Sequence, residues 1–260
     1  MNVLVTGASG PVGAALCLAL KKQNVRVIPL DIRGNIWSSD LNRRTVRMDL
    51  RRPIVRGKLP GRVDMIVHLA ANARVHELVV KPRLALDNYL MVSSVLEFAR
   101  IQRIPRLVFS SSREIYGEST RSTPRKEEDT AVANIKSPYT ASKFGAESLI
   151  HAYRHCYDLS PVIVRLSNVY GRYDVSERVI PLFFYNALRG RDLPVFGKEK
   201  KLDFTFIDDC VDGLCRVVAR IDRVAGEPFN LSTGKGERLW DLAHGIIRET
   251  ASSSQVIQGK

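Results

Sequence analysis

The most constraining feature of the sequence is a glycine-rich turn close to its start. The apolar run at 3–7 leads into Gly7, Gly10 and Gly13, and a helix-like stretch at 12–23 follows at once. Glycines at this spacing, between a strand and a helix, permit a tight turn and let backbone N–H groups approach a pyrophosphate at the helix N-terminus. The position of the triplet, more than the triplet alone, predicts a dinucleotide-binding turn.

Short apolar runs alternate with helix-like stretches through much of the chain. The runs lie at 3–7, 25–30, 65–70, 106–110 and 162–166, and the helix-like stretches at 12–23, 84–103 and 138–158. Strands that alternate with helices form βαβ units, whose parallel sheet is buried on both faces. We therefore predict an α/β fold with a doubly wound parallel sheet of the Rossmann type.

The rhythm changes after residue 170, where prolines and glycines become more frequent. We assign residues 1–169 to a dinucleotide-binding domain, with 203–223 packing back onto it. Residues 170–202 and 224–260 are expected to form a smaller C-terminal substrate lobe.

The charge balance bears on the partners of the chain. Its formal net charge is +13, and basic residues crowd the stretch from Arg43 to Arg62. That stretch has no interleaved aromatic residues and no motif of a nucleic-acid-binding module, so a solvated surface explains it better than a nucleic-acid site. A basic protein also suits an anionic small substrate.

Nothing in the sequence indicates a membrane span or a secretory signal. No apolar run approaches the roughly 18 residues of a spanning helix, and the start MNVLVTGASG lacks a basic region and a cleavage site. The four cysteines have neither metal-ligand nor CxxC spacing: Cys17, Cys156, Cys210 and Cys215. We expect a cytoplasmic protein with no metal site and no membrane partner.

Asp31 ends the second predicted strand, where a dinucleotide-binding unit places an acidic residue. Such a carboxylate accepts hydrogen bonds from ribose hydroxyls and repels a 2′-phosphate. Asp31 is alternatively a turn residue, and the neighbouring Arg33 would favour NADP. We predict NAD as the cofactor, with Asp31 and Ile32 beside its adenosine ribose.

Three serines follow the apolar run at 106–110. Ser110, Ser111 and Ser112 stand where a buried strand is expected to end. They are either the start of a loop or hydroxyls presented at the carboxyl end of a strand, where open α/β sheets keep their active sites.

The segment SPYTASK predicts a helix start that presents Tyr139 and Lys143 on one face. Ser137 fits the N-cap and Pro138 the first helical position. A phenol has an ordinary pKa near ~10, and an ammonium and a cationic nicotinamide nearby would favour the phenolate. Tyr139 is therefore our candidate base for an alcohol, with Ser112 hydrogen-bonded to the same oxygen.

Together these motifs resemble the extended short-chain dehydrogenase/reductase family, specifically its nucleotide-sugar epimerases and dehydratases. The resemblance runs over nearly the whole chain, and it depends on the order and spacing of TGASGPVG (6–13), DL (49–50), HLAA (68–71), DNY (87–89), SSSREIYG (110–117), YTASK (139–143), RLSNVYGR (165–172), VIPLF (179–183), PVFG (194–197) and DFTFIDDCVDG (203–213).

The resemblance implies roles for residues that match the family's positions. It implies a general base at Tyr139, aided by Lys143 and Ser112. The resemblance implies that Asp49 and Leu50 flank the adenine of NAD. Further NAD contacts are implied for Leu69, Ala70, Ala71, Asn88 and Ser110. A nucleotide-diphosphate sugar, foremost a UDP-sugar, is the implied substrate, with contacts from Ser112, Arg113, Asn168, Arg172, Val179 and Phe196.

Two departures from the family's pattern affect the substrate side. Leu202 stands where relatives often have an arginine for the diphosphate, and the lysines before it supply charge without a bidentate fork, so Arg172 is expected to share that role. Relatives usually continue well beyond the helix expected at 238–250, which implies a minimal or truncated lobe.

Many relatives also pair through helices equivalent to 84–103 and 138–158, so we expect a homodimer.

The reaction implied by the resemblance begins when Tyr139 takes a proton from a sugar hydroxyl while hydride passes to NAD⁺. The resulting 4-keto sugar has three fates: reduction on its other face by a 4-epimerase, loss of water in a 4,6-dehydratase, or loss of CO₂ from a uronate. Dehydratases resemble this chain but carry an Asp-Glu pair where it has Arg113-Glu114. The missing Asp disfavours dehydration, whereas Glu114 also matches a glutamate of the decarboxylases.

We therefore predict an NAD-dependent nucleotide-sugar 4-epimerase, with the dehydratase and the uronate decarboxylase using Glu114 as alternatives. Arg113 is equally explained as a partner for a substrate carboxylate or as a solvated charge. An inactive NAD(H)- or RNA-binding module is a further alternative, which the intact set Ser112, Tyr139 and Lys143 disfavours.

Overall fold

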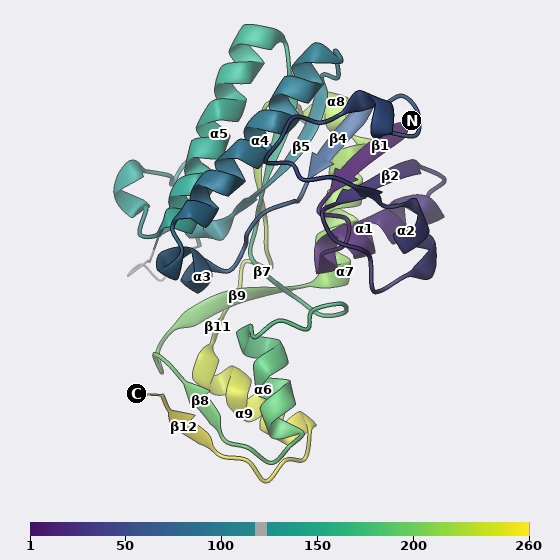
Figure 1. The fold of residues 1–260 in the computed structure, drawn as a ribbon. Helices are drawn as coiled ribbons and strands as arrows, with labels where there is room; N and C mark the ends of the chain where they lie inside the picture. The colour runs from purple at the N-terminus through teal and green to yellow at the C-terminus, as the bar shows by residue number, and fades with distance from the viewer. Residues whose placement is uncertain (118–123, 260) are drawn as a thin grey trace.

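The computed structural model describes residues 1–117 and 124–259. Figure 1 shows a larger body around a central sheet and a smaller lobe that contains the C-terminus. Within the described residues the main sheet has seven parallel strands in the order β10-β6-β5-β4-β1-β2-β3. They are β1 (Asn2–Thr6), β2 (Arg26–Asp31), β3 (Val46–Arg47), β4 (Met65–His68), β5 (Arg106–Ser112), β6 (Ser160–Leu166) and β10 (Pro228–Leu231).

Helices cover both faces of this sheet, as the predicted doubly wound fold requires. The first face is covered by α1 (Pro11–Lys22) and α7 (Ile207–Ala219), and the second by α4 (Arg83–Ile101) and α5 (Pro138–Tyr157) (Figure 1). The short elements of the body are α2 (Ser39–Arg44), α3 (Val75–Val80), α8 (Ile221–Val224), η1 (Arg56–Lys58), η2 (Arg113–Tyr116) and η3 (Val132–Asn134).

Alternation along the strands explains why there are two cores. In β1, Val3 and Val5 join the core under α1 and α7, whereas Leu4 joins the core under α4 and α5. Successive strand residues point to opposite faces, so a run that is apolar at every position serves both layers. The predicted α/β fold is confirmed.

Local sequence sets the ends of α5. The Ser137 hydroxyl accepts a hydrogen bond from the Thr140 N–H at 3.1 Å, and Pro138 is the first helical residue, as predicted. Asp158 ends the helix in the left-handed conformation with φ of 52°. These two ends fix the helix register and with it the face that carries Tyr139.

The smaller lobe has a separate core. Its elements are α6 (Val179–Ala187), β8 (Leu193–Val195), α9 (Leu239–Glu249) and β12 (Val256–Gln258). Buried apolar side chains from these elements pack together, among them Phe183, Leu193 and Ile246. Between lobe and body runs a three-stranded sheet of β7 (Asn168–Tyr170), β9 (Lys201–Phe206) and β11 (Gly236–Arg238) (Figure 1).

One strand lies outside the part to which the sequence assigned it. Residues 224–260 were expected in the lobe, but β10 forms an edge of the main sheet and pairs in parallel with β6. Its Phe229 and Leu231 pack against the core under α1 and α7, which explains why this segment returns to the body before α9 enters the lobe. The neighbouring α7 also packs in that core, against α1.

Candidate active site

The glycine-rich turn joins β1 to α1 and leaves no room for side chains at two of its glycines. Gly7 has φ of +70°, and a Cβ there would lie 2.7 Å from the Ala70 nitrogen. A Cβ at Gly13 would lie 2.0 Å from the Gly7 carbonyl oxygen. Gly10 is less restricted, because its nearest contact would be at 3.4 Å. The turn therefore brings the backbone close to the end of β4.

The start of α1 fits an anionic ligand. Gly10 is the N-cap, so no side chain caps the helix, and the first turn carries no acidic residue. The first N–H groups of a helix have no partner within it, and the helix dipole favours negative charge there. These features match the pyrophosphate of the dinucleotide predicted from the sequence.

Asp31 is held rigidly at the end of β2. Its carboxylate accepts hydrogen bonds from the Ser9 N–H at 2.9 Å and from the Arg33 N–H at 2.8 Å. Asp31 is buried, whereas Ile32 and Arg33 are exposed. Asp31, the predicted ribose contact, therefore lies directly beside the glycine-rich turn. One of its carboxylate oxygens accepts from that turn, and the other accepts from the segment after β2.

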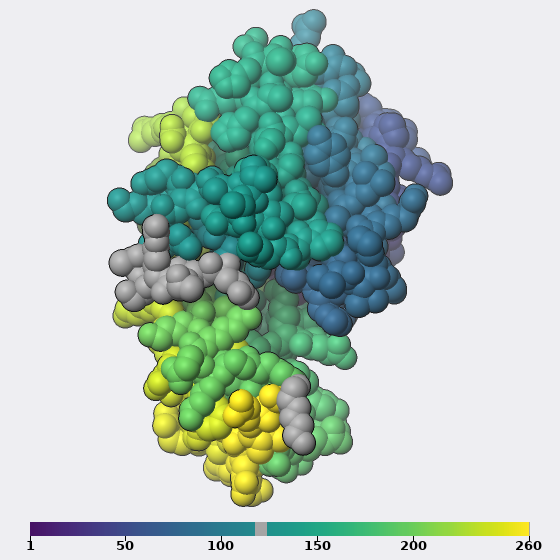
Figure 2. All heavy atoms as spheres, turned by 90° about the vertical axis from the view of Figure 1, so that its left-hand side faces the viewer, coloured from purple at the N-terminus to yellow at the C-terminus, as the bar shows by residue number. Residues whose placement is uncertain are grey.

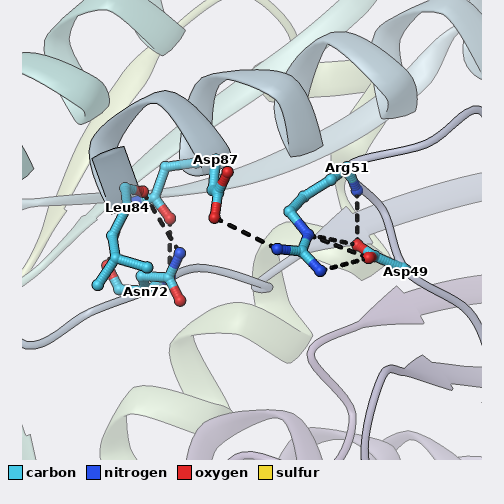
Figure 3. A network of polar contacts seen from close by, with 6 residues as sticks. Asp49, Arg51, Asn72, Leu84 and Asp87 are labelled. Atoms are coloured by element: carbon cyan, nitrogen blue, oxygen red, sulfur yellow. Dashed lines mark hydrogen bonds and ion pairs between the residues drawn. The ribbon is translucent and has the colours of Figure 1, made fainter. Parts of the chain in front are cut away.

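The predicted adenine contacts follow β3. Leu50 is buried, and Asp49 binds Arg51, which also approaches Asp87 on α4 (Figure 3). Burial of Leu50 anchors this segment in the core under α4 and α5. Because Leu50 is anchored in this way, the neighbouring Asp49 is held in place with its side chain partly exposed at the surface of the body.

A chain of hydrogen bonds connects the loop after β4 to the candidate base. Asn88 on α4 accepts from the Asn72 N–H at 2.7 Å and donates to the Ser142 hydroxyl at 3.1 Å. The Ser142 hydroxyl in turn donates to the Tyr139 carbonyl oxygen at 2.7 Å. Asn72 also donates to the Leu84 carbonyl oxygen at 3.3 Å (Figure 3).

The rest of this loop is tied to β1. Leu69 donates its N–H to the Thr6 carbonyl oxygen at 3.2 Å, and Ala70 donates to the Thr6 hydroxyl at 3.3 Å. Leu69, Ala70 and Ala71 are half-buried beside the glycine-rich turn. They lie where the resemblance implies NAD contacts.

Lys143 is fully enclosed at the carboxyl end of β5. Its Nζ donates to the Ser110 carbonyl oxygen at 2.7 Å and lies 4.9 Å from the centre of the Phe109 ring. Burial lowers the pKa of Lys143 to about 8, against the opposing effect of Glu147. The ammonium therefore loses its proton far more readily than an exposed lysine does.

Tyr139 is buried near the start of α5, the helix that packs against β5 and η2. Burial raises the pKa of Tyr139, while hydrogen bonding by Ser112 and the positive charge of Arg178 act to lower it. The net direction is upward because desolvation penalises the charged form most, and the effect of a bound nicotinamide on the phenolate stays a prediction. The ammonium of Lys143, which was expected to act on Tyr139, donates a hydrogen bond to the Ser110 carbonyl oxygen.

Glu114 and Arg113, in η2 directly after β5, form an ion pair. Arg113 Nη2 lies 2.7 Å from Glu114 Oε1, and both side chains are about one-third exposed, at 32% and 30%. The Ser112 hydroxyl caps η2 by accepting the Glu114 N–H at 3.2 Å. The predicted catalytic residues Ser112 and Glu114 are thus fixed to one another through the backbone.

The predicted substrate residues are more dispersed. Asn168 donates to the Asp203 carbonyl oxygen at 2.8 Å, Arg172 pairs with Asp208, and Val179 is the first residue of α6. Phe196 follows β8 in the lobe and is 62% exposed. The structure therefore brings the cofactor and catalytic residues together but leaves Phe196 at the surface of the lobe.

Sequence reasoning missed two residues of this neighbourhood. Arg178 precedes the VIPLF motif, and its charge acts on Tyr139. His68 is buried at the end of β4, binds the Thr6 hydroxyl at 2.7 Å and has its pKa lowered to about 3 by burial. Arg178 stands just before a motif that was noticed and His68 is the first residue of HLAA, but only tertiary packing reveals their neighbours.

Comparison with known proteins places the fold and these motifs in one family. The family described as "NAD dependent epimerase/dehydratase family" matches residues 3–232. A dTDP-glucose 4,6-dehydratase of Neisseria gonorrhoeae is 32% identical over 253 residues, covering 88% of this chain and 72% of the relative. The corresponding dehydratase of Salmonella typhimurium is 30% identical over 276 residues, covering 95% and 76%.

Solved structures of both reaction types are similar. A UDP-glucose 4-epimerase of Thermotoga maritima, solved with UDP-glucose, has a TM-score of 0.83 and 26% identity over 100% of this chain and 86% of its own. DesIV of Streptomyces venezuelae, a dTDP-glucose 4,6-dehydratase solved with NAD, has a TM-score of 0.85 and 27% identity over 100% and 85%. The predicted resemblance and the NAD cofactor are confirmed, and the chain belongs to the NAD dependent epimerase/dehydratase family.

Proposed function

We propose that this protein is a nucleotide-sugar 4-epimerase that acts through a transient 4-keto sugar. The observation that carries the proposal is the Arg113–Glu114 ion pair beside the buried Tyr139 and Ser112. Elimination of water benefits from a carboxylic acid that protonates the leaving hydroxyl as well as a base. The first position of the pair here is an arginine, which cannot serve as that acid.

Tyr139 removes the proton from the sugar hydroxyl and returns it after the ketone is reduced. Bound NAD supplies the hydride acceptor and donor. The Ser112 hydroxyl orients the reacting oxygen. The positive charge of Arg178 favours the phenolate of Tyr139 against the cost of burial, whereas the charges of Glu114 and Arg113 oppose one another. Lys143, on the same face of α5, is held by the Ser110 carbonyl oxygen and would contact the nicotinamide ribose of bound NAD.

The substrate class follows from the relatives and from the basic character of the chain. The Thermotoga epimerase is described with UDP-glucose, which supports a UDP-sugar. Val179 and Phe196 would face the nucleotide from the lobe. Asn168, in β7, and Arg172, in the turn after it, would meet the sugar and the diphosphate. Arg172 must first exchange its partner Asp208 for the ligand.

Glu114 supports a second candidate. A single carboxylate beside a 4-keto sugar can assist deprotonation at C5 or accompany the decarboxylation of a uronate, and close relatives include 4,6-dehydratases. The ion pair with Arg113 would have to open for either role.

Product analysis with a panel of UDP-, dTDP-, GDP- and CDP-sugars in D₂O separates the candidates. A 4-epimerase yields the epimer of the sugar without solvent deuterium. A dehydratase yields a 4-keto-6-deoxy sugar with deuterium, and a decarboxylase yields CO₂ from a uronate. Absence of every product, together with a salt-sensitive RNA shift, would instead support the binding module.

We also propose that the protein is a homodimer in the cytoplasm. Figure 2 shows α4 and α5 side by side on one outer face of the body, and apolar side chains stand exposed on these helices: Leu86, Tyr89, Leu90, Ile101 and Tyr157. Leu86, Tyr89 and Leu90 lie close together near the start of α4, and exposed apolar side chains that gather in this way support an association surface. Solution scattering should give twice the chain mass at micromolar concentration, and a monomer mass would refute the dimer.

No helix in the described part of the chain is long and apolar enough to cross a membrane. All four cysteines are free thiols, which suits a reducing compartment.

A further inference from the structure

Arg51 connects two carboxylates on different elements of the body. Its Nε lies 3.0 Å from both Asp49 oxygens and its Nη2 lies 2.6 Å from Asp49 Oδ2, while its backbone N–H donates to Asp49 Oδ1 at 3.0 Å. Its Nη1 lies 3.5 Å from Asp87 Oδ2 on α4. Figure 3 shows the guanidinium between the two acidic side chains.

This arrangement fixes the direction in which Asp49 points. A planar guanidinium that binds a carboxylate through two nitrogens sets the orientation of the carboxylate as well as its distance. Hydrogen bonding by Arg51 also lowers the pKa of Asp49. Because the Nε proton is shared between both oxygens, Asp49 Oδ2 retains an acceptor position for a further donor.

The second carboxylate anchors Arg51 to the framework of the site. The Asp87 side chain is only 12% exposed, and Asp87 precedes Asn88, which holds the loop after β4 and Ser142. A guanidinium that spans Asp49 and Asp87 therefore ties the segment after β3 to the turn of α4 that supports the active site.

We propose that Arg51 is a positioning residue for the cofactor, which orients Asp49 to accept the 6-amino group of the NAD adenine. The adenine amino group is a hydrogen-bond donor, and a fixed, ionised carboxylate is a strong acceptor for it. The inference rests on the proposed contact between Asp49 and the adenine. It adds a reason why this carboxylate would select adenine, which is that Arg51 fixes the direction in which the carboxylate points.

The test compares NAD with nicotinamide hypoxanthine dinucleotide, which has an oxygen in place of the adenine amino group. Calorimetric titration should show that Arg51→Met weakens NAD about tenfold, because a hydrogen bond to a charged group loses its geometry, and leaves the hypoxanthine analogue within about twofold. Arg51→Lys should restore part of the loss, since an ammonium supplies charge without the fork.

The matched control is Arg52→Met. Arg52 is the next residue, exposed and equally charged, and its backbone carbonyl accepts from Ser94 irrespective of the side chain. It should change the affinity for both dinucleotides by less than about twofold. An equal loss of both ligands in Arg51→Met would mean that Arg51 acts only through net charge, and would overturn the inference.

The variant Asp49→Ala separates the role of Arg51 from the adenine contact of Asp49, on which that role depends. If Asp49 accepts the amino group, this variant binds both dinucleotides equally. If Asp49→Ala abolishes the preference for NAD but Arg51→Met retains it in full, the role of Asp49 stands and that of Arg51 fails. If the unaltered protein shows no preference, both fail, whatever the panel of sugars shows about the reaction.

Discussion

The body and the lobe of this protein present their functional residues in different ways. In the body, polar groups are already fixed: Asp31 accepts two backbone N–H groups, Asn88 holds two partners and Lys143 binds the Ser110 carbonyl oxygen. In the lobe, Phe196 is 62% exposed, and between the two parts Arg172 is paired with Asp208. The cofactor half is preorganised, whereas the substrate half must gain its contacts from the ligand.

This difference predicts where a substitution acts. Changes in the body should alter cofactor binding or the chemical step, because the groups there are held at fixed positions. Changes in the lobe should alter substrate affinity and leave the body as it was. The predictions below test this division, beginning with the largest effect.

Tyr139→Phe should lower turnover by ~10²–10⁴-fold, since a positioned general base is lost while the ring remains. NAD affinity and the melting temperature should change little, because the buried ring still fills its site. Steady-state kinetics on the identified substrate, with calorimetric titration of NAD as the control, checks both parts. Near-normal turnover would show that Tyr139 is not the base and would favour a binding module.

Ser112→Ala should lower turnover less than Tyr139→Phe does. The serine hydroxyl only orients the reacting oxygen, whereas Tyr139 accepts its proton. A larger loss for the serine would reverse the roles proposed for the two residues.

Lys143 gives the stability of the body a pH dependence. The folded protein lowers the pKa of Lys143 from 10.5 to about 8 by burial, so between these values the unfolded chain binds more protons. Stability should therefore rise with pH through this window, by at most about 3 kcal/mol from this group. Denaturant unfolding at several pH values should show the rise in the unaltered protein relative to Lys143→Met, and parallel pH curves would contradict it.

The sequence predicted the parts of the body that depend on neighbours along the chain. The turn at Gly7 and Gly13 and the capped start of α5 at Ser137 follow from local geometry, which residue types at fixed spacing reveal. The place of β10 could not be predicted in this way, because it depends on pairing with β6, which is distant in sequence.

The same limit applies to the site. Tyr139 and Lys143 were found because one helix carries both. The charge of Arg178 acts on Tyr139 from just before α6, which is distant in sequence, and only the tertiary structure reveals this effect. The burial that raises the pKa of Tyr139 could not be predicted for a related reason: the sequence displays nearby charges but not the extent of desolvation.

Asp31 should make the body select NAD over NADP. Its two carboxylate oxygens are fixed by Ser9 and Arg33, so the side chain cannot easily turn away from a 2′-phosphate. Calorimetric titration should show at least about tenfold tighter binding of NAD, and Asp31→Asn should narrow the difference by removing the repulsion. Equal affinities in the unaltered protein would remove Asp31 from the specificity argument.

Phe196→Ala should have the smallest effect on stability and on NAD affinity. It should therefore show most clearly that substitutions in the lobe act on substrate binding alone. The ring is 62% exposed, so the free energy of unfolding should change by no more than about 0.5 kcal/mol, and NAD affinity should stay constant. If the ring stacks on the nucleotide base, the variant should lose ~1 kcal/mol of substrate binding, seen as a severalfold higher KM with turnover little changed. Leu188→Ala is a matched control, because Leu188 is an exposed apolar residue of the same lobe, directly after α6, and should leave KM unaltered. A fall in turnover or in NAD affinity for Phe196→Ala would mean that the two parts are coupled and that the division between a fixed body and an adaptable lobe does not hold.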